Sequence, residues 1–215
     1  AILKACDRLI EGQYIDQFPT DMIQGGAGTS TNMNVNEVLA NVALEIMGHP
    51  KGAYHIISPN DHINCSQSTN DAYPTAFRVA LIHRMKDYRQ IVLNLVDAFH
   101  SKGDEFSDVL KMGRTHLQDA VPMSMGAEFK GFGNNLLEEI DRIDASTRLL
   151  TEVNMGATAI GTSVNAPTGY PQLVVRHLSE LTGIDLHLSP DLVEATSYTG
   201  AYVQLSATIK RNAVK

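Results

Sequence analysis

Apolar residues recur at intervals of three and four along the middle of the chain, which is the spacing of a helix that packs lengthwise against other helices. The repeating positions are Leu81, Met85, Tyr88, Val92, Leu95 and Phe99. Asp71 is a candidate N-cap for this segment, and Pro74 is tolerated in its first turn because the missing N–H would have no partner there. The pattern therefore predicts a long bundle helix that begins near Asp71.

Several other segments show the same period. The helices predicted from them span residues 1–12, 34–47, 124–150, 170–181 and 192–209. Asn34 and Glu37 have the spacing of a capping box at the start of the second, and Gly183 is a C-cap candidate for the fourth. No segment alternates in the way that predicts a sheet. We therefore expect a mainly α protein, with a loop-rich helical N-terminal domain at 1–69 and long helices of a central helical bundle at 70–215.

Composition and charge narrow the classes of partner and compartment. The formal net charge of −7 argues against nucleic acid or an anionic membrane as a partner. Cys6 and Cys65 lie in no metal-ligand spacing, which favours free thiols in a reducing compartment. Because the chain has no signal-peptide pattern and no apolar run of membrane-spanning length, we expect a cytoplasmic protein.

Polar residues without a place in the helical patterns concentrate in four segments. These are GGAGTSTNMN (25–34), SQSTND (66–71), GRTHLQDAVP (113–122) and NMGATAIGTSVN (154–165). The second segment can hydrogen-bond through every side chain and contains no cation. Three of the segments lead into predicted helix starts, where unpaired N–H groups and a partial positive charge favour carboxylate or phosphate. A small anionic substrate is the first functional hypothesis.

A structural interpretation competes with this hypothesis, because Ser, Thr and Asn at helix starts are usually caps and Gly-rich turns are usually only turns. The first segment lacks the lysine of a phosphate-binding P-loop and the spacing of a dinucleotide fingerprint. His49, His55 and His62 lack a helical ligand spacing and are interpreted as loop residues, so no metal site is expected. Arg114 is interpreted as the ion-pair partner of an acid such as Asp119, with anion binding as the alternative.

Taken together, the four segments resemble the aspartase/fumarase superfamily along nearly the whole chain. The motifs are GTSTNMNVNEVLAN, PNDHINCSQSTNDAYPTAFR, KMGRTHLQDAVPMSMGAEF and EVNMGATAIGTSVN, in the family's order. Within the superfamily the chain is more similar to aspartate ammonia-lyases than to class II fumarases. Three features favour this: STN at 68–70, EVN at 152–154, and EATS followed by GAY within 194–202.

The resemblance implies a lyase that converts L-aspartate reversibly to fumarate and ammonia through an aci-carboxylate intermediate. It implies a homotetramer with a central helical bundle, in which each active site combines segments of three subunits. By motif position, Thr29, Ser68 and Thr69 would hold the β-carboxylate of the substrate. Asn70, Thr115 and His116 would surround its amino group and α-carboxylate, with His116 in an orienting or carboxylate-binding role. No organic cofactor is implied, although Mg²⁺ activates several aspartases.

The family's general base is a serine on a Gly-Ser-Ser loop followed by Met-Pro, and the chain lacks this pattern. Both ends of the chain lie within helical patterns, so we expect a fragment with the base beyond Lys215, inactive by itself, of an active parent protein. The family's second anion site normally begins with a His where this chain has Ser58, and that site is not carried over. A class II fumarase, another dicarboxylate lyase and a non-catalytic helical scaffold are the alternatives.

Overall fold

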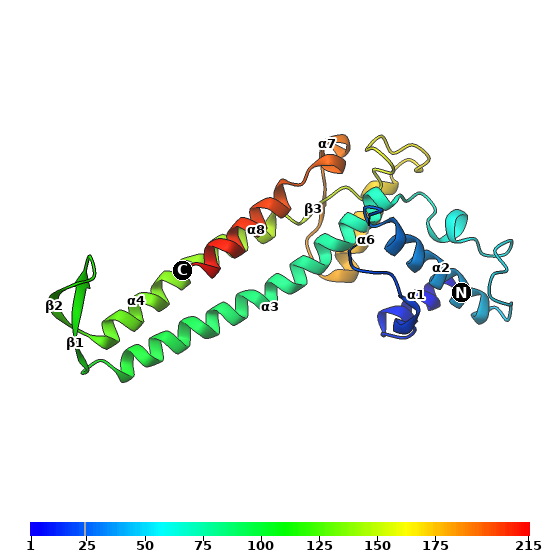
Figure 1. Ribbon diagram of the computed structural model, residues 1–215. Helices are drawn as coiled ribbons and strands as arrows, with labels where there is room; N and C mark the ends of the chain where they lie inside the picture. Colours follow the sequence, from blue (N-terminus) through cyan, green and yellow to red (C-terminus); the bar gives the residue numbers. More distant parts are fainter. Residues whose placement is uncertain (24) are drawn as a thin grey trace. The chain divides into compact units, whose positions relative to one another are not determined.

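The computed structural model describes residues 1–23 and 25–215, which are mainly α-helical, as predicted (Figure 1). The α-helices are α1 (Ile2–Ile10), α2 (Thr29–Ile46), α3 (Thr69–Glu105), α4 (Met125–Leu137), α5 (Glu139–Arg148), α6 (Tyr170–Thr182), α7 (Leu192–Ser197) and α8 (Gly200–Ala213). The short segments are the 3₁₀ helix η1 (Ile15–Gln17), the π-helix η2 (Pro59–Ile63) and the strands β1 (Leu110–Thr115), β2 (Gln118–Ser124), β3 (Glu152–Val153) and β4 (His187–Leu188). None of the helices in the described ranges is both long and apolar enough to cross a membrane.

Packing within the chain defines two compact units, and α3 contributes to both. Unit 1 comprises residues 1–78 and 152–198, and unit 2 comprises residues 79–151 and 199–215. The division expected between residues 69 and 70 concerns domains of a whole protein and stays a prediction.

One part of the core of unit 1 lies between α1 and α2 and includes several small side chains. Ala5, Ala40, Ala43 and Leu44 are each 0% exposed. The helix expected to start with a capping box at Asn34 starts earlier, at Thr29, because Gly28 adopts a left-handed conformation (φ 87°) that only glycine tolerates well. That capping-box prediction was wrong.

The actual position of Asn34 within α2 explains its role in unit 1. The Asn34 Nδ2 donates a hydrogen bond to the carbonyl oxygen of Gln17, 3.0 Å away, and so ties the η1 segment to α2. At the start of the helix, a Cβ on Gly28 would collide with the ring of Tyr73 from α3. Glycine is therefore required at position 28 both by the left-handed backbone and by the Tyr73 ring of α3.

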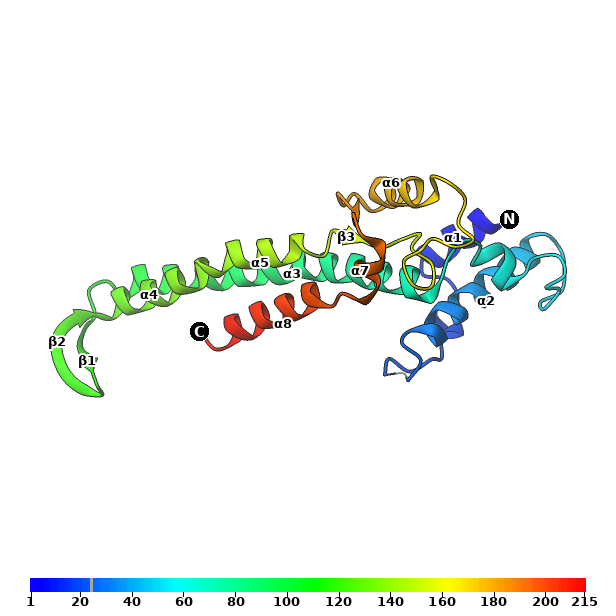
Figure 2. The ribbon, with the colours of Figure 1, turned by 90° about the horizontal axis from the view of Figure 1, so that it is seen from above.

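Unit 2 consists of long helices that run alongside one another (Figures 1 and 2). Phe99 of α3 contacts Phe129 and Phe132 of α4 with ring centroids 6.1 and 5.8 Å apart. The predicted stripe on α3 holds at Met85 and Val92, but Leu95 is 47% exposed and Val96 is buried instead. A straight helix has 3.6 residues per turn, so a strict alternation of four and three drifts off the buried face.

Two of the predicted long helices are each divided in two. The segment expected at 124–150 breaks at Glu138 between α4 and α5, and Ser124 caps α4 by accepting the Ala127 N–H at 3.0 Å. The segment expected at 192–209 breaks at Tyr198, whose extended backbone separates α7 from α8. The helix expected at 170–181 forms as α6 and ends at Gly183 in the left-handed conformation, as predicted.

Unit 2 also contains an antiparallel hairpin of β1 and β2, so the expectation of no sheet was wrong. His116 and Leu117 form its two-residue turn with φ of 49° and 62°, which is the conformation that matches the twist of hairpin strands. Both strands are largely exposed and lack apolar alternation, and the turn lacks the usual Asn or Gly. Arg114 pairs with Asp119 at 3.1 Å, which confirms the predicted ion pair.

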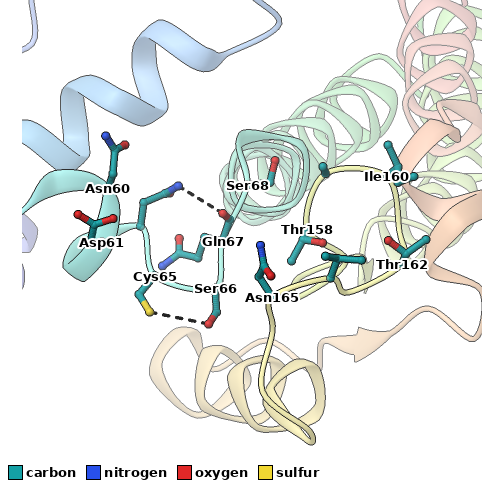
Figure 3. Close-up of a pocket in the computed structure, with 13 residues that line it drawn as sticks. Asn60, Asp61, Cys65, Ser66, Gln67, Ser68, Thr158, Ile160, Thr162 and Asn165 are labelled. Carbon is teal, nitrogen blue, oxygen red and sulfur yellow. Dashed lines mark hydrogen bonds between the residues drawn. The ribbon is translucent and has the colours of Figure 1, made fainter.

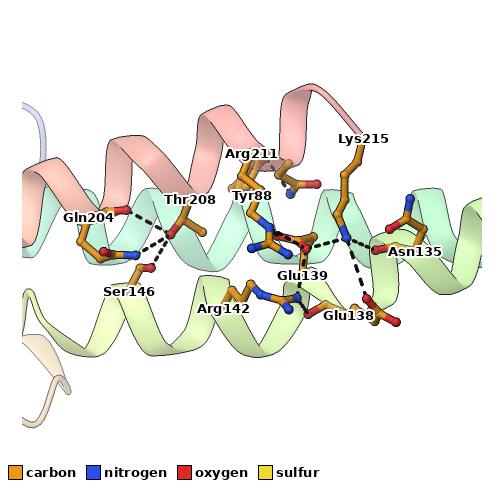
Figure 4. Close-up of polar contacts among 11 residues, drawn as sticks. Tyr88, Asn135, Glu138, Glu139, Arg142, Ser146, Gln204, Thr208, Arg211 and Lys215 are labelled. Carbon is orange, nitrogen blue, oxygen red and sulfur yellow. Dashed lines mark hydrogen bonds and ion pairs between the residues drawn. The ribbon is translucent and has the colours of Figure 1, made fainter.

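One buried acid joins α5 to α8 in unit 2. The Glu139 side chain is 0% exposed, and its carboxylate oxygens lie 3.0 Å from Arg142, 2.8 Å from Lys215 and 3.2 Å from Arg211 (Figure 4). Nearby, the hydroxyls of Ser146 and Thr208 are hydrogen-bonded at 2.6 Å in the same interface. The α5–α8 contact is therefore partly polar.

Candidate active site

The candidate site is built around the N-terminus of α3 in unit 1. Ser68 is the residue that caps this helix, because its Oγ accepts the Asn70 N–H at 3.2 Å. Asp71 returns the contact by accepting the Ser68 N–H at 2.9 Å, so the two residues form a reciprocal capping box. The prediction that Asp71 is the N-cap was therefore wrong, because α3 begins two residues earlier, at Thr69.

The hydroxyls of Ser68 and Thr69 are both prepared to donate. Ser68 Oγ accepts the Asn70 N–H, and Thr69 Oγ1 accepts a hydrogen bond from Asn32 Nδ2 of α2 at 3.1 Å. A hydroxyl has one hydrogen and two lone pairs, so an oxygen that accepts one bond from the protein can still donate its hydrogen to a ligand. The helix N-terminus adds a partial positive charge. These two residues can therefore bind a carboxylate without a formal cation.

Asn32 belongs to a small amide network that links α2 to the segment before α3. Asn64 Oδ1 accepts from Asn32 Nδ2 at 3.3 Å and from Asn36 Nδ2 at 3.0 Å. Asn36 is almost fully buried, at 5% exposed. Because the network is internally paired, the position of Asn32 against Thr69 is fixed by the fold.

Asp71 lies beneath the first turn of α3 and is 0% exposed. Its Oδ2 accepts the N–H of Gly156 at 3.2 Å and that of Thr158 at 2.8 Å, across more than 80 residues of sequence. Burial raises the pKa of the Asp71 carboxyl, and the N–H donors of Ser68, Thr158, Ala72 and Gly156 oppose that rise only in part. The carboxyl group therefore attaches a distant loop to the helix start.

That loop, residues 154–165, makes two further contacts with the same turn of the helix. Asn70 Nδ2 donates to the Ala159 carbonyl oxygen at 2.7 Å, and Asn154 Nδ2 donates to the Asn70 carbonyl oxygen at 3.0 Å. Asn154 Nδ2 also donates to Thr196 Oγ1 of α7 at 3.1 Å. The loop is thus attached both to α3 and to α7.

A cavity of about 730 Å³ lies between this loop and the segment before α3 (Figure 3). Its walls are formed by Asn60, Asp61, Asn64, Cys65, Ser66, Gln67, Ser68, Thr158, Ala159, Ile160, Thr162, Val164 and Asn165. No Lys, Arg or His is among these described lining residues, and Asp61 is the acid among them. The cavity therefore offers hydroxyl, amide and backbone donors but no positive charge of its own.

The structure brings together part of the predicted site. Ser68, Thr69 and Asn70 are consecutive at the α3 start, and Ser68 lines the cavity. Thr29 is the first residue of α2 and is exposed, one turn before Asn32. Thr115 and His116 belong to unit 2, at the end of β1 and in the hairpin turn, and both are exposed. The roles assigned to these six residues stay predictions.

Sequence reasoning missed the residues that hold the site together. Asp71 was interpreted only as a cap, and the loop at 154–165 was singled out without any assigned partner. The Gly, Thr and Asn content of the loop was a usable signal of an irregular backbone. Thr158 (φ 60°) and Asn165 (φ 68°) indeed adopt the left-handed conformation. Nothing local indicated that Asp71 would contact it.

No group of three or more His, Cys, Asp or Glu side chains in residues 1–23 and 25–215 is arranged to hold a metal ion. His62 Nδ1 accepts the Ser58 N–H at 2.8 Å, which commits one ring nitrogen to the backbone. Cys6 and Cys65 are both free thiols.

Known proteins resemble the chain along its whole length. Aspartate ammonia-lyases of Corynebacterium glutamicum, Escherichia coli K12 and Pseudomonas aeruginosa are 56%, 53% and 55% identical to it, over 100% of the chain. The chain spans 41 to 46% of the length of these relatives. These identities confirm the resemblance to aspartate ammonia-lyases.

Solved structures show the same fold. A fumarate lyase:delta crystallin from Brucella melitensis bound to cobalt matches with a TM-score of 0.95 and 49% identity, over 99% of this chain and 46% of that one. A class II fumarase from Schistosoma mansoni matches with a TM-score of 0.87 and 34% identity, over 99% of this chain and 48% of that one. The fold expected from the sequence is thus confirmed. A family model described as lyase matches residues 1–215 in full, and the chain therefore belongs to the lyase family.

Proposed function

We propose that the whole protein is an aspartate ammonia-lyase, which converts L-aspartate reversibly to fumarate and ammonia. The observation that carries this proposal is the pair of hydroxyls at the α3 start, each with its oxygen already accepting a protein hydrogen bond. The identity of more than half of the residues to aspartate ammonia-lyases supports the choice of substrate.

The chemistry explains why such donors are needed. Removing the proton from the carbon beside the β-carboxylate puts developing charge on the carboxylate oxygens, in an aci-carboxylate intermediate. Donors fixed in advance around those oxygens stabilise the transition state more than the ground state. In this proposal Thr29, Ser68 and Thr69 hold the β-carboxylate. The Ser68 hydroxyl is held by the Asn70 N–H and the Thr69 hydroxyl by Asn32. The two hydroxyls therefore need little reorganisation when the charge develops.

The remaining groups would handle the other end of the substrate. The side-chain Nδ2 of Asn70 donates to the Ala159 carbonyl oxygen, so the side-chain Oδ1 is the atom suited to accept from the substrate ammonium group. Thr115 and His116 are proposed to act near the α-carboxylate, supplied by other copies in a homotetramer. The base would be a serine outside residues 1–215, so we propose that this stretch alone does not turn over. Mg²⁺ activation and a cytoplasmic location stay predictions.

Steady-state kinetics on the whole protein test the proposal. Fumarate formation is followed by ultraviolet absorbance from L-aspartate and, separately, from L-malate, with ammonia measured in parallel. We expect fumarate and equal ammonia from aspartate and little fumarate from malate. Faster turnover of malate would favour a class II fumarase, which the match to the Schistosoma mansoni enzyme keeps as the second candidate. No turnover of either substrate would favour a non-catalytic scaffold.

A matched pair of cap variants tests the role of the hydroxyls. Ser68→Ala removes a proposed ligand donor and a helix cap, whereas Ser124→Ala removes only the cap of α4. Loss of one cap costs about 1 kcal/mol of stability in either case. Ser68→Ala should in addition lower kcat/KM for aspartate by about 10²- to 10³-fold, as expected for one donor to a developing oxyanion. Equal kcat/KM in the two variants would contradict the assignment.

A further inference from the structure

Asp71 connects the two walls of the cavity. Its Oδ1 accepts the N–H of Ser68, which lies on one wall, at 2.9 Å. Its Oδ2 accepts the N–H groups of Gly156 and Thr158, at 3.2 and 2.8 Å, in the loop that forms the opposite wall. One side chain therefore sets the separation between the helix cap and the loop.

The environment of this side chain requires both of its oxygens to accept hydrogen bonds. Asp71 is 0% exposed, and a buried polar group is stable only when it is hydrogen-bonded. An ionised carboxylate accepts on both oxygens and donates on neither, which matches N–H groups arriving from two sides. An asparagine in the same place would have to turn its NH₂ group toward either Ser68 or the Gly156–Thr158 pair, where a donor would face a donor.

The loop needs such an anchor because its own backbone is strained. Thr158, Ser163 and Asn165 have φ values of 60°, 55° and 68°. The left-handed region is costly for a residue with a Cβ, and most of all for a β-branched one such as Thr158. Thr158 N–H is the atom that Asp71 binds at the shorter distance. Contacts to the anchor therefore offset the strain at the residue where it is greatest.

We propose that Asp71 is a positioning residue for the ligand site, which fixes the loop at 156–165 so that its polar side chains close the cavity opposite Ser68. Thr158, Thr162 and Asn165 are polar loop residues that line this wall, and Figure 3 shows Thr158 and Asn165 on the part of the loop next to the segment that carries Ser66 and Ser68. They would contact the carboxylate-bearing substrate through hydroxyl and amide groups. The nature of the ligand rests on the proposed function, whereas the anchoring of the loop does not.

The first test compares two conservative substitutions in the whole protein. Asp71→Asn should raise KM for L-aspartate by about tenfold or more, the effect of roughly one lost buried hydrogen bond, with a smaller change in kcat. Asp191→Asn is the matched control. Asp191 is an exposed cap that accepts the N–H groups of Val193 and Glu194 at 3.0 Å, and asparagine is an equally good cap, so KM should stay within about twofold.

The second test measures amide hydrogen exchange and does not depend on activity. Asp71→Asn should speed exchange in the peptide that covers 156–165, while Asp191→Asn should not. If wild-type protein turns over neither aspartate nor malate, the proposed function fails, yet the exchange result still tests the anchor. If Asp71→Asn does not fold, Asp71→Ser takes its place, because its small side chain leaves room for water to pair the N–H groups. Unchanged KM together with unchanged exchange at 156–165 in the folded variant would overturn the proposal.

Discussion

Glu139 is expected to be the acid of unit 2 whose charge contributes most to stability. Its side chain is 0% exposed and contacts Arg142, Arg211 and Lys215 at 3.2 Å or less (Figure 4). Glu139→Gln preserves the shape but removes the charge, and leaves three cations close together without their common partner. Breaking a buried ion pair costs about 3–5 kcal/mol. The two arginines are 43% and 50% exposed, so solvent screens them in part and we expect the lower end of that range, about 3 kcal/mol.

Glu105 is the control that shows whether burial or the length of the ion pair decides the cost of removing the charge. Glu105 lies 2.6 Å from Lys102, closer than any partner lies to Glu139, but both side chains are about half exposed. Exposed pairs contribute about 0–1 kcal/mol, so Glu105→Gln should change the free energy of unfolding by less than about 1 kcal/mol. Urea denaturation of wild type and both variants at neutral pH, followed by circular dichroism, measures the difference. Equal costs for the two substitutions would refute the reasoning that burial decides.

The same residue gives a pH dependence with a definite sign. Burial acts to raise the pKa of Glu139, but Lys215, Arg211 and Arg142 outweigh it and the pKa lies below its ordinary value. A carboxyl group with a lower pKa in the folded state stabilises the fold above its unfolded pKa of about 4.3, and this contribution is lost as pH falls through the folded pKa. Because glutamine resembles the protonated acid, the difference between wild type and Glu139→Gln should shrink below about pH 4. A constant difference across that range would contradict the assigned shift.

Two further predictions concern unit 1. Gly28→Ala forces a left-handed alanine against the Tyr73 ring, and should cost about 2–4 kcal/mol from backbone strain and overpacking together. Gly48→Ala, also at positive φ but with open space around it, should cost only about 1–2 kcal/mol, as measured by urea denaturation of both variants. For the thiols, burial and then the charge of Asp7 raise the pKa of Cys6, whereas Cys65 is exposed, so a disulfide reagent should label Cys65 first. Peptide mapping after partial labelling identifies the residue that reacts first. Labelling of Cys6 before Cys65 would contradict this reasoning.

The helical content was predictable because it depends on local periodicity, whereas helix starts depended on contacts that sequence spacing does not reveal. The start of α2 illustrates this. Asn34 and Glu37 had an acceptable capping pattern, but Gly28 could adopt a left-handed turn and Tyr73 of α3 packs on it. The hairpin was missed for a different reason. Its strands are exposed, so no buried face imposes an alternation on their sequence.

The candidate site divides in the same way. Ser68, Thr69 and Asn70 are consecutive, so a local run of polar residues before a helical pattern was enough to find them. The anchor between Asp71 and Thr158 joins residues 87 positions apart, and its existence depends on how the loop folds back. A carboxylate in a capping position has the same sequence signature whether it faces water or a distant loop. Only the burial of Asp71 distinguishes the two.

The described lining of the cavity has no positive charge to balance an anionic substrate. The proposed substrate, L-aspartate, has two carboxylates and one ammonium group and passes through a more negative intermediate, yet the described lining holds Asp61 and no Lys, Arg or His. Fixed neutral dipoles stabilise developing charge by a few kcal/mol each, but they do not balance the formal charge that enters the cavity. Under the proposed function, the balancing charge must therefore come from groups outside the described lining of this cavity.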